Sequence, residues 1–120
     1  MTPTSPVTEI HIVGQMIPMS HLVQILLPLA DQNQMLFAQA FYDKVRDELT
    51  AVFGGVTMYS NSPAEGLWDA GDRIHSDQML TVEVMVGHLD REWWSSYRVD
   101  LEPRFSQHEI VIRALLVERL

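Results

Sequence analysis

The chain of 120 residues contains no cysteine, which excludes disulfide bonds, thiolate catalysis, iron–sulfur clusters and cysteine-ligated zinc. Basic residues are scarce, since eight Lys and Arg stand against sixteen Asp and Glu, and none precedes Lys44. Sequence-independent nucleic-acid binding needs clustered cations, so we expect no nucleic-acid partner. The N-terminus also lacks the basic region of a signal peptide, and the sequence therefore predicts a cytoplasmic protein.

Long hydrophobic runs are missing as well. The longest, residues 22–30, is interrupted by Gln24 and Pro28 and is far shorter than the roughly 18 apolar residues that a membrane-spanning helix needs. We therefore expect no membrane partner. Apolar residues nevertheless make up 47% of the chain and charged residues 20%, a composition typical of globular proteins. A chain of this length predicts one domain with its own core.

The spacing of apolar residues predicts two helices between four strands. Strands are expected at residues 21–27, 56–60, 77–86 and 108–117. The inward stripes of the two helices are expected to be Phe37, Ala38, Phe41, Val45, Leu49 and Val52, then Trp94, Tyr97, Leu101 and Phe105. Asp31, with Asn33 as a second candidate, is expected to cap the first helix and Asp90 the second. Gly54 supplies the left-handed residue that ends the first helix.

The order β-α-β-β-α-β predicts the α+β class and a ferredoxin-like fold, a four-stranded antiparallel sheet with two helices on one face. The first strand is expected between the third and fourth, with the second strand at an edge. Residues 20–120 form the single predicted domain. Residues 1–19 form an N-terminal extension, whose residues 8–13 are expected to pair as a strand with a sheet edge of the same or another subunit.

Strand alternation divides the side chains between the two faces of this sheet. The face away from the helices is expected to carry Leu22, Gln24, Leu26, Thr57, Tyr59, Met79, Thr81, Glu83, Met85, Val111, Arg113, Leu115 and Val117. Most of these residues are apolar, and a broad apolar face invites association. We therefore expect a homodimer or a larger assembly.

Three polar residues of this face are candidate ligand-binding residues. Glu83 and Arg113 lie on the strands that flank the first strand, with Gln24 between them. In a ligand pocket, Glu83 would act as a base or acceptor and Arg113 would hold an anion. Alternatively, the two charges form an interface ion pair that fixes the register of a dimer.

Tyr59 and Trp68 bracket a polar loop between the two middle strands and complete the candidate ligand-binding set. Their aromatic side chains would line a ligand pocket. Alternatively, they would pack over one end of the sheet and have only a structural role. No catalytic residue is assigned. The five histidines show no metal-binding spacing, and the sequence contains neither a G-x-G-x-x-G motif nor a P-loop. We therefore expect no metal and no cofactor.

Three segments carry a resemblance to a known group of proteins: residues 53–59 (FGGVTMY), 62–68 (SPAEGLW) and 104–110 (RFSQHEI). Together they resemble a family of small, functionally uncharacterised bacterial proteins. The resemblance covers about residues 20–120 and implies a ferredoxin-like fold of the dimeric α/β-barrel type. It implies no catalytic residue. Small cofactor-free monooxygenases and muconolactone-type isomerases are similar at the level of the fold, from which function does not follow.

Three functions fit these observations. The first is a small-molecule-binding homodimer with its pocket on the open sheet face, beside the middle loop. The second is a small cofactor-independent enzyme of the isomerase or monooxygenase type, which would use the same pocket with Glu83 or a nearby histidine as base. The third is a structural interaction module in which every polar residue of that face belongs to an interface.

Overall fold

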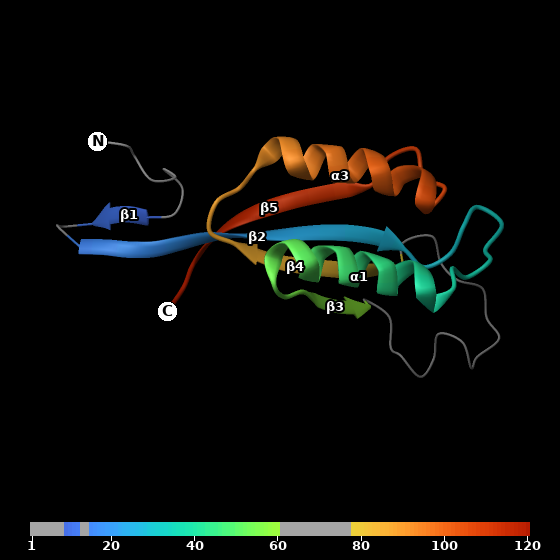
Figure 1. Cartoon of the computed structure of the whole chain (residues 1–120), viewed down its shortest axis with the longest axis horizontal. Helices are drawn as coiled ribbons and strands as arrows, with labels where there is room; N and C mark the ends of the chain where they lie inside the picture. Colours follow the sequence, from blue (N-terminus) through green and yellow to red (C-terminus); the bar gives the residue numbers. More distant parts are fainter. Residues whose placement is uncertain (1–8, 13–14, 61–77) are drawn as a thin grey trace.

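An antiparallel sheet of four strands forms the centre of the computed structural model, which describes residues 9–12, 15–60 and 78–120 (Figure 1). The sheet contains β2 (Gln15–Pro28), β3 (Thr57–Ser60), β4 (Met79–Val86) and β5 (Val111–Glu118). β2 pairs with β4 on one side and with β5 on the other, and β3 pairs with the outer side of β4. The predicted strand order is therefore confirmed, with the strand after the first helix at an edge.

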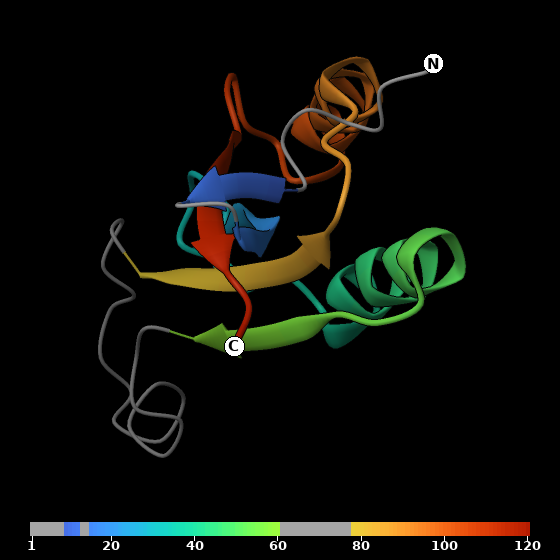
Figure 2. The same ribbon diagram turned by 90° about the vertical axis from the view of Figure 1, so that its left-hand side faces the viewer.

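Two helices, α1 (Gln39–Phe53) and α3 (Arg91–Arg104), cover one face of the sheet (Figure 2). The predicted α+β class and the ferredoxin-like β-α-β-β-α-β order are thereby confirmed. The opposite face carries no helix. In the described part of the chain, neither helix is long and apolar enough to cross a membrane.

The first strand of the sheet is longer than predicted. β2 begins at Gln15 rather than at His21, and Pro18 lies within it. Its first residues, 15–18, pair with β1 (Glu9–Ile12), so β1 and the start of β2 form a hairpin that projects beyond the sheet (Figure 1). A strand within residues 8–13 is confirmed at Glu9–Ile12, but the expected pairing with a sheet edge is wrong, because β1 pairs with the start of the central strand β2. The predicted boundary between residues 19 and 20 falls inside β2, and the division into extension and domain stays a prediction.

The core lies between the helices and the sheet. From the sheet, Val23, Ile25, Leu27, Val82, Val84 and Val86 are buried, as their strand positions predict. On α3 the predicted stripe of Trp94, Tyr97 and Leu101, continued by Phe105, is confirmed. Together these residues form one continuous apolar cluster with the inner side of α1.

The inward face of α1 differs from the prediction at several positions, since Phe37 and Ala38 precede the helix and Ala38 is exposed. Tyr42 is buried with Val45 and Leu49, whereas Phe41 is 41% and Val52 55% exposed. The Tyr42 hydroxyl donates a hydrogen bond of 2.7 Å to the carbonyl oxygen of Pro28, so the polar end of this ring is satisfied inside the core. Burial raises the pKa of Tyr42 to about 12, because the phenolate would lose its hydration.

Of the two predicted helix caps, one is wrong and one is confirmed. The N-cap of α1 is Ala38, which contributes no side-chain hydrogen bond. The carboxylate of Asp31 instead accepts hydrogen bonds from the backbone N–H groups of Asn33 and Met35, so it orders a turn before the helix. Asp90 caps α3 by accepting from the N–H of Trp93, as predicted. Gly54 ends α1 with φ of 88°, in the left-handed region.

Candidate functional site

A row of four polar side chains crosses the helix-free face of the sheet. The register places Gln24 of β2 directly opposite Glu83 of β4 and Arg113 of β5. The Gln24 amide nitrogen donates to Oε2 of Glu83 at 2.7 Å, and the Gln24 amide oxygen accepts from Nε of Arg113 at 2.7 Å. From β3, the Tyr59 hydroxyl donates to the same Glu83 oxygen at 2.8 Å. We call these four residues the polar row.

The sequence correctly places these four candidates on one face but does not predict how they connect. A direct Glu83–Arg113 ion pair was one expectation, and in the described part of the chain Arg113 forms no ion pair. β2 separates β4 from β5, so the two charges start about 10 Å apart, twice the spacing of neighbouring strands. The Gln24 amide fills this gap, because it donates at one end and accepts at the other.

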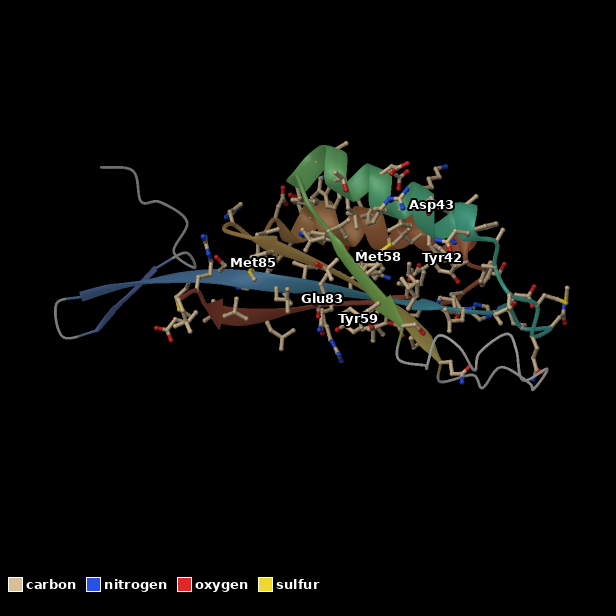
Figure 3. All side chains as sticks on the ribbon, turned by 90° about the horizontal axis from the view of Figure 1, so that it is seen from below. Tyr42, Asp43, Met58, Tyr59, Glu83 and Met85 are labelled. Atoms are coloured by element: carbon tan, nitrogen blue, oxygen red, sulfur yellow. The ribbon has the colours of Figure 1, made fainter. Side chains whose placement is uncertain are left out.

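Figure 3 shows Tyr59 and Glu83 on the side of the sheet away from the helices. Their hydrogen bond has an electrostatic consequence. The bond to the Glu83 carboxylate raises the pKa of Tyr59 above its ordinary value, because ionisation would remove the donated proton and place two negative charges together. Tyr59 therefore stays a hydrogen-bond donor over a wide pH range, and it holds the outer end of the polar row on the edge strand.

Mostly apolar residues flank the polar row along the strands. On one side Leu22 pairs with Met85 and Leu115, and on the other side Leu26 pairs with Thr81 and Val111. Met85, Val111 and Leu115 are each about half exposed to solvent. We use the term open face for the polar row together with these six flanking residues. The open face is therefore largely apolar on both sides of the polar row, with Thr81 as the one polar flanking residue.

One hollow on the described surface lies at one end of the open face. It has a volume of about 580 Å³ and forms where β2 ends and where β4 and β5 begin. Leu26 and Val111 of the open face contribute to its wall, but no residue of the polar row does. We call this cavity the end hollow. The predicted pocket between the open face and the middle loop stays a prediction, because residues 61–77 lie outside the described residues.

Gln78, a polar residue of the end hollow, is not among the candidate site residues predicted from the sequence. Gln78, just before β4, lines it, and the side-chain oxygen of Gln78 is buried and accepts no hydrogen bond within the described residues. In the predicted strand 77–86, Gln78 shares its face with Leu80, Val82, Val84 and Val86, and this apolar pattern gave no reason to consider Gln78 a binding residue. The candidate Trp68 lies outside the described residues. Among the residues that are described, no three His, Asp or Glu side chains converge as metal ligands would.

No protein-family model, no curated protein and no solved structure matches this chain. The fold assignment therefore depends on the topology of the sheet and helices alone.

Proposed function

We propose that the protein is a cytoplasmic homodimer that binds a small molecule, with the open face as the dimer interface and the end hollow as the binding site. The observation that carries the first part is the pattern of the open face. Largely apolar residues on both sides of a single polar row form a surface that loses apolar exposure when a second copy covers it. The resemblance to bacterial proteins of the dimeric α/β-barrel type agrees with this proposal.

Charge complementarity favours a second copy as the partner. When two sheets pack about 10 Å apart with their two-fold axis parallel to β2, Gln24 faces Gln24 of the second copy. Because β4 and β5 lie on opposite sides of β2, Glu83 of each copy then faces Arg113 of the other. The apolar Met85 likewise faces Leu115. A two-fold axis along the polar row would instead place Glu83 against Glu83, which like-charge repulsion disfavours.

In this arrangement the polar row sets the register of the interface, in line with the interaction-module hypothesis. The ligand-binding role passes to the end hollow, which has the volume of a typical small-molecule site. The enzyme hypothesis used Glu83 as a base. Because Oε2 of Glu83 already accepts hydrogen bonds from Gln24 and Tyr59, its environment favours a structural role over proton abstraction.

Two neighbouring leucines of β5 provide a matched test of the interface. Leu115 and Leu116 are similarly exposed, 45% and 51%, but alternation places Leu115 on the open face and Leu116 on the opposite one. The wild type should sediment at twice its 13.7 kDa chain mass at micromolar concentration. Leu115→Glu should sediment as a monomer, and Leu116→Glu should keep the wild-type mass. A monomeric wild type, or equal effects of the two substitutions, would contradict the proposed interface.

A further inference from the structure

The end hollow is built from parts that are far apart in the sequence. The end of β2 and the turn after it form one wall, with Leu26, Leu29 and Asp31. The segment that enters β5 forms the facing wall and includes Glu109 and Val111. Gln78 and Met79, at the start of β4, close one side. A volume of about 580 Å³ lies within the range of sites that hold small organic ligands.

The rim of this hollow is held in place by hydrogen bonds. In the first wall, the N–H of Asp31 donates to the carbonyl of Met35 at 2.9 Å, and that of Phe37 donates to the carbonyl of Leu29 at 3.1 Å. The side-chain amide of Gln32 crosses to the facing wall and donates to the carbonyl of Ser106. The two walls are therefore tied together, and a ligand would meet a largely formed site rather than having to order one.

Contacts with helix α3 hold the facing wall in position. The carboxylate of Glu102 accepts a hydrogen bond of 3.1 Å from the backbone N–H of Ile110, while it also pairs with Arg98 at 2.8 Å. Ser106 adopts φ of 52°, a left-handed conformation that is uncommon for residues other than glycine, and so turns the chain from α3 toward β5. These constraints hold Glu109 at the rim.

The polar lining of the end hollow is acidic but mixed: besides two carboxylates it contains His108 and four side-chain amides that can both donate and accept, those of Gln32, Gln34, Gln78 and Gln107. Its apolar floor includes Leu26, Met79 and Val111, and its rim carries the carboxylates of Asp31 and Glu109. No Lys or Arg lines it among the described residues. The buried oxygen of Gln78 accepts no hydrogen bond there, which is an unfavourable state for an amide carbonyl. Rotation about the broad terminal torsion of this side chain can present that oxygen to the hollow.

From this lining we propose that the end hollow binds a small organic amine, that is, a protonated primary amine on an apolar body. The ammonium group donates to the Gln78 oxygen and lies near the rim carboxylates, while the apolar body covers Leu26, Met79 and Val111. The ammonium supplies the donor that the Gln78 oxygen lacks, and the acidic rim attracts a cation. This inference rests on the small-molecule part of the proposed function, and because Leu26 and Val111 also belong to the open face, the amine would bind at the border of the proposed interface.

Three probes that share one ring and differ in charge test the ligand class. Benzylamine, benzyl alcohol and benzoate are titrated into the full-length protein at neutral pH, and heats of binding are recorded. Benzylamine should bind most tightly and benzoate most weakly. Benzoate binding as tightly as benzylamine would overturn the ligand class but leave the end hollow as a binding site. Failure of all three probes at millimolar concentration would overturn the site itself, while the sedimentation mass would still report on the dimer.

Two substitutions locate the binding within the end hollow. Gln78→Leu should weaken benzylamine binding about tenfold, since it removes the acceptor, and should raise the thermal unfolding midpoint because it also removes an unpaired buried oxygen. Gln39→Leu, at an exposed amide on α1, is the matched control and should leave binding unchanged. Glu109→Gln should weaken benzylamine but not benzyl alcohol, whereas Glu118→Gln, at the far end of β5, should affect neither. Unchanged benzylamine binding in Gln78→Leu would overturn the proposal.

Discussion

Gln24 connects Glu83 to Arg113 through the two ends of a single amide, with hydrogen bonds of 2.7 Å on each side. An uncharged residue on the central strand thus links opposite charges on the two strands beside it. The link depends on the register, because a shift of β4 or β5 by one residue would move Glu83 or Arg113 to the helix-covered face. The polar row therefore stabilises one alignment of the sheet as well as the charges themselves.

The first prediction concerns this amide. Gln24→Leu removes the donor to Glu83 and the acceptor for Arg113 at once, so two hydrogen bonds to charged groups are lost, one partly buried and one exposed. We expect a loss of about 1–3 kcal/mol in the free energy of unfolding, measured by urea titration. Gln39→Leu removes an exposed amide that donates to Asp43 and should cost only about 0.5 kcal/mol or less. Equal costs for both variants would show that the polar row adds nothing to stability.

The second prediction concerns Tyr42 at alkaline pH. Its pKa is about 12 in the folded protein and 10.0 for an unperturbed tyrosine, so the unfolded chain loses this proton first as the pH rises. The stability that this difference contributes is fully present below pH 10 and is lost between about pH 10 and 12. Tyr42→Phe should lower stability at neutral pH by about 1–2 kcal/mol, through loss of the hydrogen bond to Pro28.

Tyr42→Phe should also unfold with a smaller dependence on pH between about 10 and 12 than the wild type does, as the linkage between ionisation and folding requires. Urea titrations at a series of alkaline pH values measure both slopes. Parallel slopes for the two proteins would contradict the assignment of alkaline lability to Tyr42.

The third prediction concerns the contact between the two helices. Arg104 of α3 donates two hydrogen bonds to the Glu48 carboxylate of α1, at 2.8 and 2.9 Å, and Tyr97 donates a third at 2.8 Å. Burial by itself would raise the pKa of Glu48, but the hydrogen bonds from Arg104 and Tyr97 outweigh it and lower the pKa. The stability from Glu48 is therefore present above its unfolded-state pKa and is lost as the pH falls through the lowered folded value.

Arg104→Lys keeps the charge but loses the paired geometry, and we expect a cost of about 1–2 kcal/mol at neutral pH that shrinks in acid. Arg46→Lys is the control, because Arg46 pairs with Asp43 and Asp47 on the exposed side of α1 and its loss should cost about 0.5 kcal/mol or less. Chemical unfolding at neutral and acidic pH measures both variants. A cost for Arg104→Lys that does not change with pH would contradict this account of Glu48.

Much of the sheet could be predicted from the sequence, because successive side chains of a strand point to opposite faces. Once one residue of a strand is assigned to a face, the faces of all its other residues follow. Once β4 was recognised by Val82, Val84 and Val86, the position of Glu83 on the other face followed. The connection through Gln24 could not be predicted, since strand order and alternation restrict the register without setting which residues face each other.

The incorrect predictions have local causes. The apolar pattern of a helix does not settle which of two adjacent residues at the border of its buried face points inward. Tyr42 rather than Phe41 is buried because its hydroxyl reaches the Pro28 carbonyl at the end of β2. Asp31 is a good helix cap by type, but here its carboxylate orders the preceding turn. The end hollow could not be predicted because its walls, at Leu29, Gln78 and Glu109, come from three segments that only the folded chain brings together.

The most direct test of the proposed dimer is a charge-exchange experiment on its two facing residues. Glu83→Lys and Arg113→Glu each place like charges opposite one another in a homodimer, so sedimentation velocity should show each variant alone as a monomer. In an equimolar mixture, Lys at 83 of one copy faces Glu at 113 of the other, and the two unchanged residues face each other as in the wild type. The account predicts that the mixture sediments as a heterodimer. A mixture that stays monomeric, or single variants that dimerise like the wild type, would contradict it.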